Sequence, residues 1–180
     1  MSRKLFSQLA AVTIAALTLS ACVESRVPFV TNAQPLLGQQ FEVHLYEDFV
    51  DNKANATHAA VYQWKEGQYV RVSGLSRDAK GFAAQALAGN DFLLQSSYES
   101  SGAYVYWIGR KFAPGVYLIF GVDENDTDEA TRNAICGVDR PHGVCRVSAR
   151  DELMTLARAT AAKPPRKAAL AVVLNRPAAF

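Results

Sequence analysis

The side chains best suited to chemistry in this 180-residue chain are Cys136 and Cys145, which have eight residues between them. Such a pair predicts a structural disulfide, a redox-active dithiol, or a metal site that His142 would help to complete. Catalytic dithiols usually follow a C-x-x-C spacing, and structural zinc requires four ligands at tighter spacing. We therefore expect a disulfide, worth about 2.5 to 3 kcal/mol in the chain-entropy model, and no metal ion or cofactor.

The loop between the two cysteines carries the polar side chains of Asp139, Arg140 and His142. A disulfide would hold this loop in shape, and rigidly presented loops often make functional contacts. These three residues are therefore candidate binding residues.

Carboxylates and histidines could instead serve as the acids and bases of a hydrolase. Glu42 and His44 share one face of a predicted strand, and Asp123 and His142 would have to join them through tertiary contacts. The chain contains no G-x-S-x-G, H-E-x-x-H, phosphate-loop or dinucleotide-binding motif. A hydrolase is therefore the alternative hypothesis, and a non-catalytic binding or assembly module is the first.

Two further clusters have a structural and a functional interpretation. The acidic run of residues 123–129 lacks the glycine and the final glutamate of an EF-hand loop, so we assign it to a helix N-terminus, with a weak surface ion site as the alternative. Aromatic residues crowd the predicted strands and favour a sheet core. However, Tyr104 and Tyr106 alternate with Val105 and Trp107, so an open face here would be an aromatic binding surface.

The first residues of the chain have the pattern of an export signal. Arg3 and Lys4 precede an apolar stretch, residues 5–19, that is too short to span a bilayer comfortably. The segment Leu19-Ser20-Ala21-Cys22 then resembles the lipobox of bacterial lipoprotein precursors, in which small residues precede an obligatory cysteine. This resemblance covers the leader alone, and an ordinary cleaved signal or an uncleaved anchor is the alternative.

The resemblance implies that the Cys22 thiol receives a diacylglyceryl group, that the signal is cut before Cys22, and that the new amine is acylated, typically with palmitate. Two or more acyl chains make membrane attachment lasting. Val23 stands where an aspartate would resemble an inner-membrane retention signal, so we expect an outer-membrane protein that faces the periplasm. In that oxidising compartment, Cys136 and Cys145 are expected to pair.

Charge and length limit the classes of function. Removing the 21-residue leader leaves 159 residues, a length expected for one domain with a real core. Two of the 19 basic residues and none of the 17 acidic ones lie in the leader, so 17 of each sign remain. A neutral mature chain lacks the electrostatic attraction that nucleic-acid binding requires. The expected partners are the membrane, through the anchor, and an envelope protein or polymer.

Hydrophobic periodicity predicts an α+β fold, in which an antiparallel sheet of hairpin and meander strands carries two or three helices and one disulfide. We expect a signal peptide over 1–21, a lipid-anchored tether over 22–40, a single domain over 41–175 and a loose tail over 176–180. The expected strands are 41–49, a hairpin over 59–72 closed through Gly67, 91–98, 104–110, 116–122, 144–147 and an edge strand over 168–174. The expected helices are 79–87, 127–135 and one capped by Ser148 and Asp151 that buries Leu153, Leu156, Ala157 and Thr160.

Overall fold

The computed structural model describes residues 23–46, 58–74, 81–97, 101–138 and 143–175. Ten strands lie in these ranges: β1 (Val23–Ser25), β2 (Gln40–Tyr46), β3 (His58–Lys65), β4 (Gln68–Gly74), β5 (Gly81–Ala86), β6 (Asp91–Ser97), β7 (Tyr104–Ala113), β8 (Val116–Gly121), β9 (Cys145–Arg146) and β10 (Ala169–Asn175). The helices are α1 (Glu129–Cys136), α2 (Arg150–Ala161) and a 3-10 turn, η2 (Glu124–Asp126).

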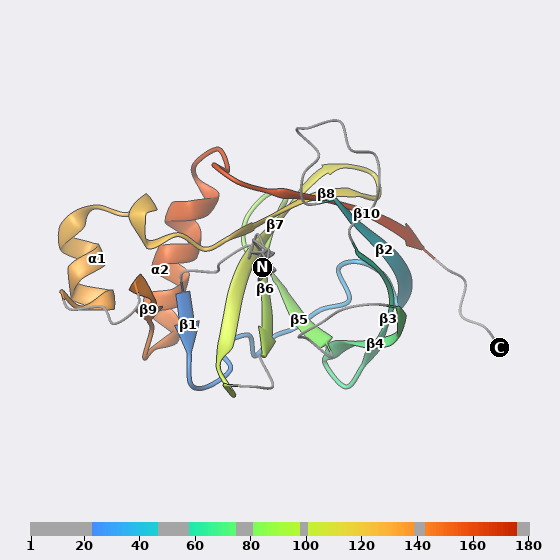
Figure 1. The fold of residues 1–180 in the computed structure, drawn as a ribbon, viewed down its shortest axis with the longest axis horizontal. Coiled ribbons are helices and arrows are strands. Elements are labelled where there is room, and N and C mark those ends of the chain that lie inside the picture. The colour runs from blue at the N-terminus through green and yellow to red at the C-terminus, as the bar shows by residue number, and fades with distance from the viewer. Residues whose placement is uncertain (1–22, 47–57, 75–80, 98–100, 139–142, 176–180) are drawn as a thin grey trace, which may run out of the picture.

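Eight of these strands close into an antiparallel barrel. Their order is β6-β5-β4-β3-β2-β10-β8-β7, and β7 pairs with β6 again to complete the circle. The helices, β1 and β9 lie together on one side of the barrel (Figure 1). The predicted antiparallel sheet with helices and a disulfide is confirmed in this coarse form, whereas the closure was not predicted.

Several predicted strands are confirmed. The hairpin of β3 and β4 turns through Glu66 and Gly67, which both have positive φ angles, of 49° and 82°, as a tight two-residue hairpin turn requires. Strands β6, β7 and β8 form the predicted meander. Strand β2 fits the start of the predicted strand 41–49, whose last residues lie outside the described ranges.

The predicted helix over 79–87 is wrong, because residues 81–86 form strand β5. Phe82 and Ala84 lie in the barrel interior, while Ala83 packs on the opposite face. Alanines and a phenylalanine at these spacings fit a period of two as well as a helical period, and β5 pairs with β6 at five positions. Tertiary pairing therefore decides the structure here.

Strand β10 was predicted at the edge of the sheet, but it lies between β2 and β8. It pairs with β2 from Leu170 to Asn175 and with β8 from Ala169 to Val172. Small or branched residues, Ala169, Ala171 and Val173, alternate along its buried face. This alternation permits a central position, and β10, the last strand of the described ranges, joins β2 to β8.

The segment expected to be a tether is part of the fold over residues 23–40. Val30 and Leu37 are buried within it. The backbone N–H groups of Phe29 and Val30 donate to the Gln95 side chain at 2.7 and 2.9 Å, and that of Leu37 donates to the Tyr69 hydroxyl at 2.8 Å. Irregular backbone can pack in this way when side chains supply the acceptors that a strand ladder otherwise would.

Both longer helices begin near their predicted starts, with different caps. Asp128 caps α1 by accepting from the Thr131 N–H at 2.9 Å. At α2, the Glu152 carboxylate accepts from the N–H groups of Ser148 and Ala149, so Glu152 takes the role predicted for Asp151. The predicted buried face of α2 is confirmed: Leu153, Leu156, Ala157 and Thr160, joined by Met154.

The sheet has an apolar core on each face of the β6–β8 region. The barrel interior holds aromatic side chains whose ring centroids lie 4.9 to 6.4 Å apart: Phe41, Tyr62, Trp64, Tyr69 and Phe82. The outer core packs β6, β7 and β8 against β1, β9 and α2: it includes Val23, Leu93, Tyr106, Ile108, Phe120, Leu153 and Leu156. Arg110 on β7 joins the layers, because it pairs with Asp91 at 2.7 Å and donates to the Ala161 carbonyl.

Substitution of Gly109 tests the packing inside the barrel. A Cβ at this position would lie 2.2 Å from Cε2 of the Phe92 ring. Gly109→Ala should therefore lower the free energy of unfolding in urea by about 1 to 3 kcal/mol, the cost typical of overpacking. Phe92→Leu is the matched variant, since it removes the ring, and the double variant should lose less than the sum of the two single losses. Strict additivity would contradict this account.

Candidate functional site

The candidate site is the junction where β1 enters the fold, directly after Cys22. The side chains of Val23 and Ser25 are buried, with 0% and 2% exposed. On one side β1 is antiparallel to β7, with Glu24 opposite Val105. On the other side it is parallel to β9, with Val23 opposite Cys145. The first described residue is therefore a core residue held between two strands.

A buried hydroxyl pair holds β1 against β7. The Ser25 and Tyr106 hydroxyl oxygens lie 2.6 Å apart, and Ser25 also donates to the Val27 carbonyl at 2.5 Å. Burial raises the pKa of Tyr106 to about 12, against the lowering effect of this hydrogen bond, and burial likewise raises the pKa of Tyr69 in the barrel to about 12. Both tyrosines are thus held in their neutral form.

The predicted open aromatic face is absent at the described residues that were expected to form it. Tyr106 is completely buried, and Tyr104 is half-buried against the same outer core. The alternation along β7 correctly indicated that Tyr104 and Tyr106 share one face of the sheet, but β1 and the helical layer cover this face. Tyr106 therefore acts as a structural contact and not as a surface binding residue.

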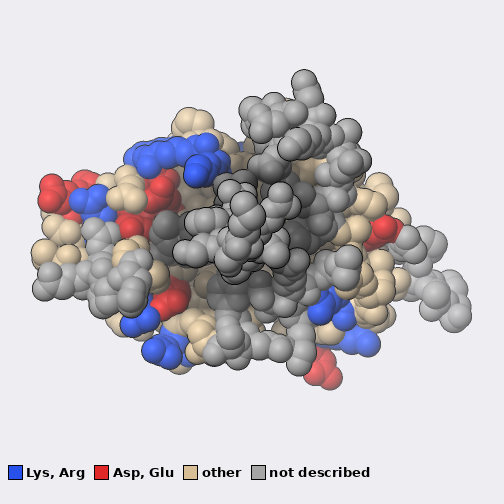
Figure 2. All heavy atoms as spheres, in the orientation of Figure 1, with Lys and Arg blue, Asp and Glu red and all other residues tan. Residues whose placement is uncertain are grey.

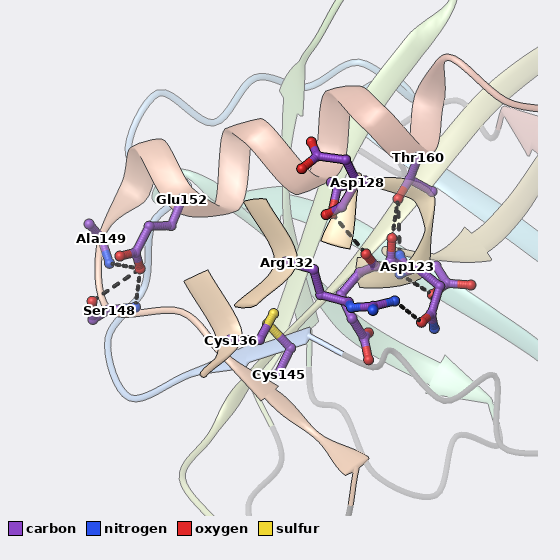
Figure 3. Close-up of a disulfide and its surroundings, with 12 residues drawn as sticks. Asp123, Asp128, Arg132, Cys136, Cys145, Ser148, Ala149, Glu152 and Thr160 are labelled. Atoms are coloured by element: carbon purple, nitrogen blue, oxygen red, sulfur yellow. Dashed lines mark hydrogen bonds between the residues drawn. A yellow bond between two sulfur atoms is a disulfide. The ribbon is translucent and has the colours of Figure 1, made fainter. Parts of the chain in front are cut away.

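The predicted disulfide between Cys136 and Cys145 is confirmed, with the two Cα atoms 4.7 Å apart (Figure 3). It ties the last residue of α1 to the first residue of β9, and Cys145 is fully buried. Strand β9 continues into a backbone hydrogen bond from Val147 to Glu24 at 2.9 Å, and the Arg146 Nε donates to the Glu24 carboxylate at 2.5 Å. The disulfide thereby fixes α1 beside β1.

The candidate contact residues between the cysteines, Asp139, Arg140 and His142, lie outside the described residues. Over the described ranges, no three His, Cys, Asp or Glu side chains gather as they would to hold a metal ion.

The acidic run after β8 is held by contacts with basic residues and with α2. Arg166 lies 3.5 Å from Asp123 and 3.2 Å from Asp126, and Lys163 lies 3.5 Å from Asp126. The Asp123 backbone N–H and carbonyl both bond to the Thr160 hydroxyl, at 3.0 and 3.2 Å. Asp123 caps η2 and Asp128 caps α1, which supports the assignment of the run to a helix N-terminus.

The structure brings together only part of the predicted hydrolase set. Glu42 and His44 lie 2.9 Å apart on the outer wall of the barrel, and both are half-buried. His44 is opposite Val172, which is in turn opposite Val116 on β8. Gly121, the last residue of β8, lies five residues beyond Val116, or roughly 17 Å at 3.3 Å per strand residue, and Asp123 follows it. His142 lies outside the described residues.

Sequence reasoning missed the roles of Ser25 and Gln95, two of the polar residues that secure the N-terminal segment. Gln95 is buried in β6, where it stands between the apolar run Phe92-Leu93-Leu94 and two serines. A glutamine that interrupts a buried strand is a signal for a structural acceptor, since a buried amide requires partners. Ser25 carries no comparable signal, because serine is common in exposed linkers.

No protein-family model, no curated protein and no solved structure matches this chain.

The raised tyrosine pKa values predict a loss of stability at alkaline pH. The unfolded chain releases a tyrosine proton near pH 10, whereas the folded chain retains those of Tyr69 and Tyr106 to about pH 12. The unfolded state therefore binds fewer protons, and the free energy of unfolding should fall as pH rises from about 10 to 12. In urea unfolding between about pH 10 and 12, the free energy of unfolding of Tyr106→Phe should fall less steeply with pH than that of the wild type.

Phe120→Leu is the control for this measurement, because it weakens the same outer core without removing a titrating group. It should lower stability at every pH and keep the wild-type slope. An unchanged slope in Tyr106→Phe would contradict the role assigned to the buried hydroxyl.

Proposed function

We propose that this chain is a lipid-anchored protein of the bacterial cell envelope. Its first 21 residues direct export, Cys22 carries the lipid, and the domain faces the periplasm from the outer membrane. There it binds or assembles with another envelope protein or with an envelope polymer. The observation that carries this proposal is the segment Leu19-Ser20-Ala21-Cys22, which resembles a lipobox and stands immediately before the buried strand β1.

The architecture of the junction supports an anchoring role for Cys22. A lipid attached there is connected to Val23, which lies in the outer core between β7 and β9. A force on the anchor is therefore transmitted to the sheet, to the disulfide and to α1. No helix of the described part of the chain is long and apolar enough to cross a membrane.

A binding or assembly role is preferred over hydrolysis. Only Glu42 and His44 among the predicted catalytic groups contact each other in the described structure, and they lie two residues apart on one strand. A half-exposed pair of this kind is typical of a surface ion pair, worth about 0 to 1 kcal/mol. The contact nevertheless keeps an envelope hydrolase as the second candidate, with Glu42 and His44 as its residues.

Replacement of Cys22 tests the proposal. Wild-type protein recovered from the membrane fraction should yield an N-terminal peptide that begins at Cys22 and has the mass of a diacylglyceryl and an acyl group. Cys22→Ala should abolish this mass and move the protein out of the membrane fraction. Cys136→Ala/Cys145→Ala is the matched control, since it removes cysteines of the same chain and should leave the protein acylated.

In-cell crosslinking of the wild type and of Cys22→Ala, followed by mass spectrometry, then identifies the envelope partners. Crosslinked envelope partners should be lost or strongly reduced in Cys22→Ala, because delocalisation removes the protein from the surface on which it assembles. An unmodified Cys22 in the wild type would refute the anchoring. Cleavage of envelope polymers by the purified protein, abolished in Glu42→Gln, would favour the hydrolase instead.

A further inference from the structure

We infer that the domain sits directly on the membrane surface, with the ends of the disulfide loop as the contacting face. The inference rests on the proposed lipidation of Cys22 and goes beyond it by assigning an orientation and a contact surface. Its starting point is the absence of a spacer within the described part of the chain: residues 23–40, expected to provide reach, are folded.

The covalent distance between lipid and core is short. Consecutive Cα atoms lie about 3.8 Å apart, so the thioether and glyceryl bonds on Cys22 place the acyl esters within roughly 10 Å of the Val23 Cα. Val23 cannot leave the core to lengthen this connection without breaking β1, since its side chain is 0% exposed. A domain of this size has a radius of gyration of about 15 Å. The fold must therefore lie against the bilayer surface.

The strand register identifies which residues share the end of β1 that carries the anchor. Because β1 and β9 are parallel and Val23 is opposite Cys145, Val144 lies at the same end of this strand pair as the start of β1. The disulfide places Cys136 beside Cys145, with 4.7 Å between their Cα atoms. Both described ends of the disulfide loop, residues 137–138 and 143–144, therefore flank the anchored end.

The chemistry of these loop ends suits a lipid surface. Val138 is 78% exposed, more than any other large apolar side chain in the described ranges, and the exposed Gly137 and Gly143 add no charge. A valine in this position can enter the interfacial region of a bilayer at little cost. The partner that covers this face is accordingly the phospholipid membrane to which Cys22 is attached.

On the other side of β1, acidic side chains are paired with basic ones, which is compatible with a surface of anionic lipids. Val122 donates a backbone hydrogen bond to Tyr106, so the acidic run that begins at Asp123 starts close to β1. The carboxylates of Asp123 and Asp126 are paired with Lys163 and Arg166. Lys and Arg side chains gather beside acidic ones at the helical end of the molecule (Figure 2). This pairing reduces the repulsion that free carboxylates would feel at the membrane surface.

Hydrogen exchange on membrane-bound protein tests this inference. Lipidated wild type is placed in nanodiscs of phosphatidylethanolamine with a minority of phosphatidylglycerol. The matched variant carries about 12 flexible Gly and Ser residues between Cys22 and Val23, which adds roughly 20 Å of reach. The amides of Gly137, Val138, Gly143 and Val144 should exchange at least about fivefold more slowly in the wild type than in the insertion variant.

The hairpin turn between β3 and β4 provides the internal control. Gly67 at this turn is exposed, and β2, β10 and β8 separate β3 from β7, the strand that β1 joins. The Gly67 amide should exchange equally in the two proteins, which also shows that the insertion leaves the fold intact.

Two results would overturn the inference, and they are distinguishable by mass spectrometry of Cys22. If Cys22 is acylated and the loop-end amides exchange at the same rate in both proteins, the domain does not contact the membrane, although it is anchored. If Cys22 carries no lipid, the proposed anchoring fails and the membrane contact fails with it.

Discussion

The pairing of β1 with β7 is the interaction on which the arrangement of the molecule depends. One edge of β7 is paired with β6, and the other is shared between β8 and β1. In the described structure, β9 pairs with β1, and the disulfide attaches α1 to β9. A three-residue strand thereby connects the barrel to a large part of the helical layer. The buried contact between Ser25 and Tyr106 fixes its position.

Because of this arrangement, part of the outer face of the barrel is buried and carries apolar residues. Strands β6, β7 and β8 carry aromatic and aliphatic side chains on both faces, because one face lines the barrel and the other lies under β1 and α2. Two-sided burial is normally the property of sheets covered by helices. The covering strand and the core are therefore one mechanical unit. Attachment to the membrane would then orient the whole domain.

Local patterns in the sequence were sufficient for the hairpin at Gly67, the meander, the buried face of α2 and the disulfide, since each depends on neighbours in the chain. Barrel closure, the central place of β10 and the strand at 81–86 depend on pairing between distant segments, which periodicity does not encode. At the candidate site, the disulfide between Cys136 and Cys145 was predicted from sequence and is confirmed, while the lipidation of Cys22 stays a prediction. The burial of Val23 and Tyr106 was missed, because prolines and irregular spacing in residues 24–40 resemble a linker until Gln95 and Tyr69 are seen to satisfy its backbone.

The most direct test of this account compares two mature chains, both secreted and oxidised, that begin at Val23 and at Phe41. Residues 23–40 belong to the folding unit, since they contribute β1 and the buried side chains of Val30 and Leu37. The chain from Val23 should unfold in urea in one cooperative transition, and the chain from Phe41 should show no such transition or a midpoint far lower. Equal midpoints for the two chains would show that the N-terminal segment is a tether after all, and would contradict the account.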